Sequence, residues 1–234
     1  GIDEGMMNVG VDYFLKYGNR DRKAQAYYLR AVVREDNKSG NQADWANDLL
    51  LATKEVKGSG NHMLAAMINL RYAVVLNDRK WYDASLPYLE KGLEEAEKAG
   101  SLAFQVTALI NLSHRALFLG DENKDYSEAI EYANRAAEIS KGDDNDYARA
   151  LYNLGACYSR NGQFDKALEC ASTAVRAQER LFREGKRKAR VRYAVLADAF
   201  RKMNIPDSAL FYAAKEMEAS DLIAKLSGSQ LSYI

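Results

Sequence analysis

Hydrophobic and polar residues follow each other along this chain with the spacing of amphipathic helices. Apolar residues recur three and four positions apart in stretches such as Ala129 to Ala133 and Ala167 to Ala171, which places them on one face of a helix. Proline occurs only twice in 234 residues, and its scarcity favours long, uninterrupted helices. The pattern therefore predicts an all-α fold and argues against a β-sandwich or a parallel sheet.

The helical stretches repeat with a period of about 42 residues. Three segments share the pattern apolar, large, Asn, Leu: Met67 to Leu70, Leu109 to Leu112 and Leu151 to Leu154. Behind these segments, and behind a fourth at Leu196, runs a second helical stretch that opens on an alanine: Ala84, Ala129, Ala167 and Ala209. Each unit therefore consists of two helices joined by a turn, and such a period is typical of stacked helical repeats.

Gly, Asn and Asp residues mark the expected turns. Within the units we expect turns at Gly120–Asp121, Asn161–Gly162 and residues 202–206, and between the units at residues 57–61, 98–101 and 141–146. The acidic run from Asp143 to Asp146 lacks the ligand spacing and the later Glu of a calcium loop. We interpret it as a helix cap.

The fourth unit resembles the tetratricopeptide repeat family. It contains the combination of small and aromatic residues typical of that family: Leu154, Gly155, Tyr158, Gly162, Ala167 and Ala174. The third unit is similar, whereas the second departs from the pattern at Lys91 and the fifth at Glu216, where the family favours a small residue. The 42-residue spacing resembles the longer-helix variety of this repeat found in kinesin light chains.

The resemblance implies a right-handed α-solenoid of about five antiparallel helix pairs, which we expect to form a single domain over residues 1–234. Residues 1–61 would form degenerate N-terminal helices, with one helix near Asp12 to Tyr17 and a first pair between Tyr28 and Ala52. Residues 62–226 would form the clear repeats, and residues 227–234 a C-terminal tail. Small residues such as Gly155 and Ala167 would let paired helices approach closely.

No residue pattern indicates catalysis, a cofactor or a metal. The chain has two histidines and two cysteines, no Cys-x-x-Cys pair and no phosphate-binding loop, so we predict that this segment is not an enzyme. A parent chain could carry a kinase domain. We expect Cys157 and Cys170 to be buried free thiols. The 33 basic and 33 acidic residues give a net charge of zero, so the chain has no overall attraction to nucleic acid or acidic membranes.

In proteins of this family the first helix of each unit lines a concave groove that accepts extended peptides, and this implies a binding face. The candidate residues on it are Asn69, Tyr72, Asn111, His114, Arg149, Tyr152, Asn153 and Arg160. An amide can both donate to and accept from a peptide backbone, and an arginine pairs with a carboxylate. The alternatives are that the asparagines only support the fold, that the arginines are solvated, and that His114 is a satisfied, partly buried histidine.

A basic patch surrounds Gly185. It contains Arg183, Lys186, Arg187, Lys188, Arg190 and Arg192. Binding of nucleic acid or phosphate by residues 183–192 is one interpretation, and a solvated turn between two repeats is the favoured one, because the patch lacks interleaved aromatic residues except Tyr193.

We therefore predict a protein- or peptide-binding scaffold, an input or interaction module of a larger signalling protein. The alternative is the extracytoplasmic sensor region of a bacterial two-component histidine kinase or of a membrane-linked transcriptional regulator, to which the last unit is faintly similar. We expect no membrane insertion in this segment, because apolar runs such as Leu64 to Leu76 are interrupted by charges. The compartment, cytoplasmic or periplasmic, and the oligomeric state stay open. The chain begins with Gly1 rather than Met, and we take it to be a segment of a longer protein.

Overall fold

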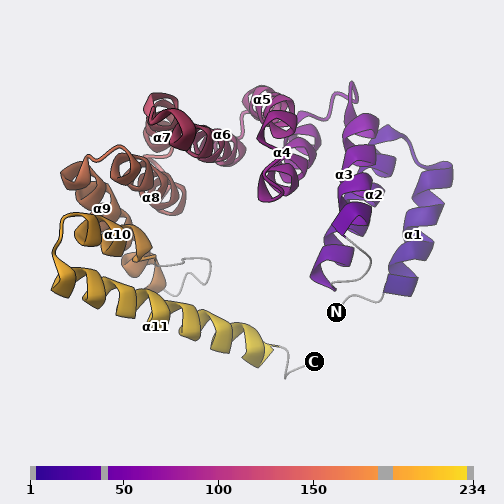
Figure 1. Ribbon diagram of the computed structural model, residues 1–234. Helices are drawn as coiled ribbons and strands as arrows, with labels where there is room; N and C mark the ends of the chain where they lie inside the picture. The colour runs from indigo at the N-terminus through magenta and orange to yellow at the C-terminus, as the bar shows by residue number, and fades with distance from the viewer. Residues whose placement is uncertain (1–3, 38–41, 184–191, 231–234) are drawn as a thin grey trace. The chain divides into compact units, whose positions relative to one another are not determined.

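The structure is a computed structural model that describes residues 4–37, 42–183 and 192–230. Over these residues the regular structure is entirely helical, and consecutive helices form antiparallel pairs (Figure 1). The helices are α1 (Glu4–Tyr17), α2 (Arg20–Asp36), α3 (Gln42–Val56), α4 (His62–Asp78), α5 (Tyr82–Lys98), α6 (Leu102–Asn123), α7 (Ser127–Ile139), α8 (Asp144–Arg160), α9 (Phe164–Arg183), α10 (Ala194–Lys202) and α11 (Pro206–Gln230). The predicted all-α fold of paired helices is confirmed.

The chain divides into two compact units, residues 1–111 and residues 112–234, with the boundary inside α6. Each unit is a stack of helices with a core of its own. The expected continuity of one domain from residue 1 to residue 234 stays a prediction.

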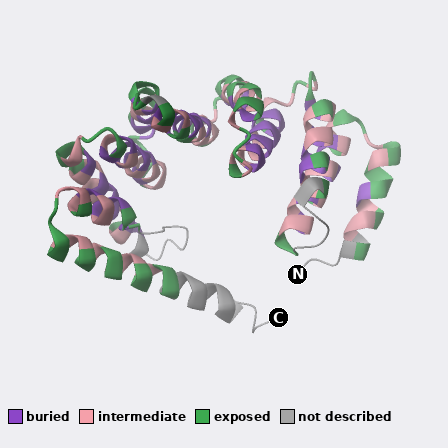
Figure 2. Cartoon of the chain, viewed as in Figure 1, coloured by how far each residue is buried: buried purple, intermediate pink, exposed green. Residues whose placement is uncertain are grey.

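In the first unit, α2 packs on α3, α3 on α4 and α4 on α5. Small alanines such as Ala24 and Ala52 alternate with larger apolar residues such as Val56 and Ile68 in the interfaces, which lets neighbouring helices approach closely. A buried ion pair also joins α2 to α3, since Asp48 accepts hydrogen bonds from Arg30 and Arg34. Figure 2 shows α4 largely buried within this unit.

The contact between α4 and α5 explains why the second repeat departs from the family pattern at Lys91. The small residue that the helix pair needs stands one position later. A Cβ atom on Gly92 would lie 2.5 Å from Cδ2 of Leu70, a distance that packed carbon atoms do not reach. Lys91 itself is only half-buried. The close contact between α4 and α5 is therefore kept, with the small residue one position later than in the family pattern.

In the second unit, α8 packs against both α7 and α9, and α10 packs against α9 and α11. The expected close approach at Gly155 is confirmed. A Cβ atom there would lie 3.2 Å from the carbonyl oxygen of Ala167 on α9 and 3.3 Å from Cγ1 of Val195 on α10. The glycine therefore brings α8 close to two neighbouring helices at once.

The expected turn at Gly120–Asp121 is wrong. Helix α6 continues through Gly120 to Asn123, and the chain turns at residues 124–126. Gly120 is buried, and a Cβ atom on it would lie 2.3 Å from the carbonyl oxygen of Asp125. Its small size therefore serves the close approach of the following turn to the helix, rather than a break in the helix.

The remaining turns lie close to where the sequence predicts them. Gly162 has a φ of 75°, a conformation that glycine adopts without steric cost. Asp143 caps α8, because its Oδ1 accepts from the backbone N–H groups of Asn145 and Asp146 at 2.9 Å each, so capping is confirmed for this acidic run. At the C-terminus, α11 extends to Gln230 and includes the first part of the expected tail.

Helix α6 is long and apolar enough, by length and composition alone, to cross a membrane. The sequence analysis considered apolar runs such as Leu64 to Leu76 and missed this helix. In the structure, Val106, Leu109 and Leu112 of this helix are buried. Burial of these side chains against neighbouring helices thus accounts for the high hydropathy of α6.

Candidate ligand-binding faces

The three periodic asparagines use their amide N–H groups within the protein. Nδ2 of Asn69 donates to the carbonyl oxygen of Ala65, and Nδ2 of Asn111 donates to that of Thr107, both at 2.8 Å. These bonds span one helical turn. The two amides therefore satisfy the backbone of their own helices, which agrees with the alternative that asparagine supports the fold.

Asn153 joins different helices instead. Its Nδ2 donates to Oγ of Ser113 on α6 at 2.7 Å, and Ser113 in turn donates to the carbonyl oxygen of Ala129 on α7 at 2.9 Å. Asn153 is 2 % exposed and Ser113 is fully buried. Oδ1 of Asn153 has no hydrogen-bond partner among the described residues. The amide thus ties three helices together, and its role in ligand binding stays a prediction.

Tyr72 lies in the core of the first unit. It is 9 % exposed and packs edge-to-face on Tyr88, with 4.7 Å between the ring centroids. Burial raises the pKa of its hydroxyl, and the nearby Tyr88 adds to that rise. The side chain of Tyr72, which the sequence assigned to the binding groove, therefore packs mainly in the core.

Three predicted residues, His114, Arg149 and Tyr152, lie in the second unit together with one residue that was assigned only to the basic patch. The guanidinium of Arg192 lies over the ring of Tyr152, 5.3 Å from its centroid. Although part of the His114 side chain is exposed, neighbouring groups displace water from around it, and this, followed by the positive charge of Arg192, lowers its pKa. Burial also raises the pKa of Tyr152. We call His114, Arg149, Tyr152 and Arg192 the arginine–tyrosine cluster.

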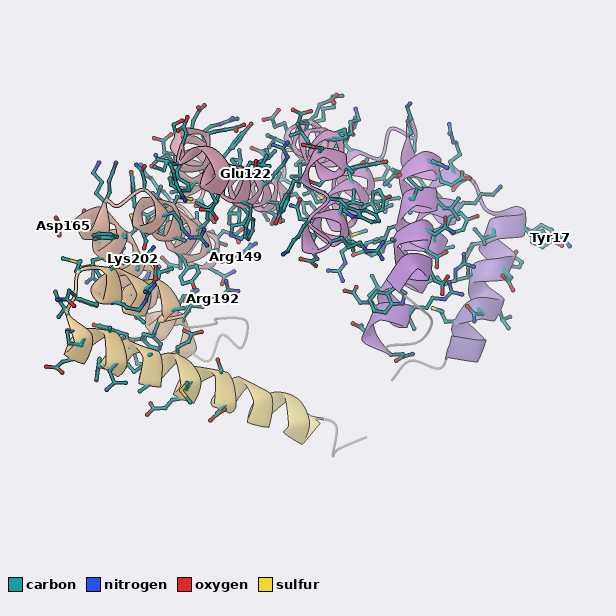
Figure 3. All side chains as sticks on the ribbon, viewed as in Figure 1. Tyr17, Glu122, Arg149, Asp165, Arg192 and Lys202 are labelled. Atoms are coloured by element: carbon teal, nitrogen blue, oxygen red, sulfur yellow. The ribbon has the colours of Figure 1, made fainter. Side chains whose placement is uncertain are left out.

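The cluster is partly open to solvent. His114 and Arg192 are exposed, while Arg149 and Tyr152 are half-buried. Arg149 forms an ion pair of 2.7 Å with Asp146 of the same helix. Figure 3 labels both arginines, Arg149 on α8 and Arg192 just before α10, in the second unit. Within the described residues, Arg192 forms no ion pair.

Arg160, the last predicted residue, forms an ion pair further along α8. Its guanidinium lies 2.5 Å from Oδ2 of Asp121, whose Oδ1 accepts a hydrogen bond from the hydroxyl of Tyr126 at 2.8 Å. The arginine lowers the pKa of Asp121, and the hydrogen bond to Asp121 raises that of Tyr126. Arg160 thus joins α6 to α8, which agrees with a structural role.

Residues 122–180 and 146–220 match the profile of the tetratricopeptide repeat. Residues 122–220 are therefore similar in sequence to tetratricopeptide repeats. The match covers α7 to α10 and thus includes three of the four cluster residues: Arg149, Tyr152 and Arg192. No curated protein sequence matches the chain significantly.

Solved structures show the same fold at low sequence identity. BtubC (BKLC) from P. vanneervenii aligns with a TM-score of 0.64 and 21% identity, over 76% of this chain and 72% of that one. Aspartyl phosphate phosphatase F from Bacillus subtilis aligns with a TM-score of 0.63 and 14% identity, over 92% of this chain and 64% of that one. A Rap protein complexed with Competence and Sporulation Factor aligns with a TM-score of 0.56 and 19% identity, over 95% and 72%. These identities support a common fold only.

Two further sequence predictions concern the basic patch and metal binding. Of the basic patch, residues 184–191 lie outside the described part of the chain, so its interpretation as a nucleic-acid site stays a prediction. Among the described residues, no group of His, Cys, Asp or Glu side chains could hold a metal ion.

Two features were missed at the level of sequence. Arg192 precedes α10 and contacts α8 40 residues earlier in the chain, and no local pattern links the two. The second is a cavity of about 850 Å³ in the first unit, between the end of α3, the start of α4 and one side of α5. Asn69 is among its lining residues.

Proposed function

We propose that this protein is a non-catalytic module that binds a protein or peptide, and that the arginine–tyrosine cluster of the second unit is the main contact for the ligand. Helical repeats present a preformed face, so most of the ordering entropy on binding falls on the ligand. One of the similar solved structures is a complex with Competence and Sporulation Factor, which shows that this fold can hold a partner.

The observation that carries the proposal is the position of Arg192 over Tyr152. The face of an aromatic ring attracts a cation and so helps to hold the guanidinium of Arg192 in position. This guanidinium has no carboxylate partner among the described residues. The opposite holds for Arg149 and Arg160, which already face Asp146 and Asp121. Of these three arginines, Arg192 is therefore the one that a ligand can use without breaking an ion pair between described residues.

These properties define the ligand. A guanidinium binds a carboxylate through two parallel hydrogen bonds, and the ring of Tyr152 adds an apolar surface beside it. His114 is held toward its neutral form, so its ring can accept a hydrogen bond as well as donate one. A peptide that places an acidic side chain or a C-terminal carboxylate next to an apolar residue fits this cluster.

The test is a selection from a random peptide library displayed on beads, followed by measurement of the dissociation constant of a selected peptide by fluorescence anisotropy. We expect acidic peptides to be enriched. Arg192→Gln should weaken binding about fivefold or more, since hydrogen bonds to charged groups are worth about 1.5–3 kcal/mol. Tyr152→Ala should weaken binding about twofold or more, since a cation–π contact is worth about 0.5–2 kcal/mol. The matched control is Arg180→Gln, because Arg180 is an exposed arginine of α9.

The control variant should bind like the unchanged protein. A library that yields no enriched peptide contradicts the proposal. Equal affinity of the unchanged protein and of Arg192→Gln for every selected peptide would contradict the assignment of the cluster.

A further inference from the structure

The first unit contains a cavity of about 850 Å³ that is separate from the arginine–tyrosine cluster. It lies where α3 ends, where the turn of residues 57–61 leads into α4, and where α5 runs alongside. Its volume is within the range of about 300–1,000 Å³ that is typical of sites for small molecules. Part of the lining is apolar and consists of Leu50, Val56, Ala65, Pro87 and Tyr88. The cavity can therefore hold the apolar body of a small ligand.

A buried carboxylate stands on the α5 side of this cavity. Glu95 is 6 % exposed. Its Oε2 lies 2.6 Å from Nδ1 of His62, and its Oε1 lies 3.0 Å from Nζ of Lys91 and 3.7 Å from Nζ of Lys98. Both lysines also pair with Glu94. The two lysines of α5 are thus matched by two glutamates, and this side of the cavity is close to neutral.

The α3 side carries an excess of positive charge. Lys54, in the last turn of α3, and Lys57, directly after that helix, both line the cavity and are exposed. Within the described residues, neither lysine forms an ion pair. The end of α3 and the start of α4 meet at this point, and their dipoles have opposite signs. The charge at the mouth of the cavity is therefore set by the two lysines.

From this combination we infer that the cavity is a binding site for a small amphiphilic anion. The ligand would have an apolar, drug-sized body with one carboxylate, sulfonate or phosphate group. The body would contact Ala65, Pro87 and Tyr88, and the anionic group would lie at Lys54 and Lys57. An anion at Lys54 and Lys57 does not compete for the partners of Glu95, because those partners are His62, Lys91 and Lys98.

Two fluorescent probes of similar shape and different charge test the inference. One is 8-anilino-1-naphthalenesulfonate, which carries a sulfonate, and the other is neutral N-phenyl-1-naphthylamine. We expect saturable binding of both to the full chain. The double variant Lys54→Gln/Lys57→Gln should weaken binding of the sulfonate by up to about fivefold for each lysine removed, since a surface charge contact is worth up to about 1 kcal/mol. It should leave the affinity for the neutral probe unchanged.

A second variant tests the position of the apolar body. Thr53 is a half-buried lining residue of α3, so Thr53→Trp should place an indole in the cavity and weaken both probes. The matched control for charge is Lys141→Gln/Lys166→Gln, which removes two lysines of the second unit, and circular dichroism checks that each variant folds. The control should bind both probes like the unchanged protein.

Three results would overturn the inference. They are the absence of saturable binding by the unchanged protein, an unchanged affinity of the Lys54→Gln/Lys57→Gln variant for the sulfonate at low salt, and unchanged affinities of a folded Thr53→Trp variant for both probes. None of them bears on the peptide-binding cluster, which uses other residues in the other unit.

Discussion

Asn153 donates a hydrogen bond of 2.7 Å to Oγ of Ser113, a residue 40 positions earlier in the chain. Both side chains are buried. The bond connects the first helices of two successive repeats, α6 and α8, and Ser113 extends it to α7 through the carbonyl oxygen of Ala129. A periodic residue that the repeat pattern places on a binding face is thus part of the contact between repeats.

Replacement of this asparagine should destabilise the protein. Asn153→Ala removes the donor to Ser113 and should lower the free energy of unfolding by about 1–3 kcal/mol, measured by urea denaturation. The matched control is Asn111→Ala. Asn111 is half-buried and, among the described residues, its side chain bonds within its own helix. The better helix propensity of alanine should therefore offset the loss there. Equal destabilisation by both changes would contradict the inter-repeat role of Asn153.

Gly120 and Gly10 are both helical glycines, yet alanine should affect them in opposite directions. A Cβ atom on Gly120 would lie 2.3 Å from the carbonyl oxygen of Asp125, whereas one on Gly10 would have no neighbour within 4 Å. Gly10→Ala should therefore raise the free energy of unfolding by about 0.5–1 kcal/mol, and Gly120→Ala should lower it by about 1–3 kcal/mol. Thermal unfolding followed by circular dichroism measures both. A stabilised Gly120→Ala variant would contradict the close approach.

The two cysteines should be slow to react in the folded protein. Burial raises the pKa of each thiol from 9.0 to about 11, so both are protonated at pH 8, and the thiol is a poor nucleophile. Reaction with iodoacetamide at pH 8, followed by mass spectrometry, should label Cys170 slowly and Cys157 only after unfolding, because Cys157 is buried and Cys170 is half-buried. Rapid labelling of Cys157 in the folded protein would contradict its position.

The same shift gives a pH dependence of stability. A thiol whose pKa is higher in the folded than in the unfolded state stabilises the protein below the unfolded value, and this contribution is lost as the pH rises. For Cys157 the loss should occur between pH 9 and about 11. The free energy of unfolding should fall less steeply over this range in Cys157→Ser than in the unchanged protein. Parallel curves would contradict the assigned pKa.

The ion pair between α2 and α3 should be sensitive to loss of its carboxylate. Asp48 is 2 % exposed and accepts hydrogen bonds from Arg30 and Arg34. Asp48→Asn removes the buried negative charge that faces the guanidinium groups of Arg30 and Arg34 and should cost about 3 kcal/mol. The control Asp144→Asn removes an exposed partner of Arg180 and should cost less than about 1 kcal/mol. Urea denaturation compares the two, and similar costs would contradict the structural role of Asp48.

Much of the fold could be predicted because the repeat is determined by residues that are close together in the sequence. The period of the apolar residues, the glycine at position 162 and the cap at Asp143 each depend on neighbours a few residues away. The turn at Gly120 was misplaced for the opposite reason. Its glycine is required by a contact with Asp125, and a glycine that ends a helix cannot be told from one that is crowded within it.

The candidate site was harder to predict, because it depends on contacts between repeats. Periodicity indicates that Asn69, Asn111 and Asn153 occupy equivalent positions, but it does not say which neighbours their amides meet. Arg192 contacts Tyr152 of the preceding repeat. The residues next to Arg192 in the sequence indicated only a basic turn. The cavity near Lys54 depends on how α3 and α5, the second helices of two successive pairs, are positioned around α4. No local sequence pattern predicts that arrangement.

The most direct test of the central claim is the location of a bound peptide on the second unit. Amide chemical shifts of ¹⁵N-labelled protein, recorded with and without an acidic peptide selected for binding, report this location residue by residue. The account predicts the largest changes at His114, Arg149, Tyr152 and Arg192. Changes confined to α7 and α9, with these four residues unaffected, would contradict it.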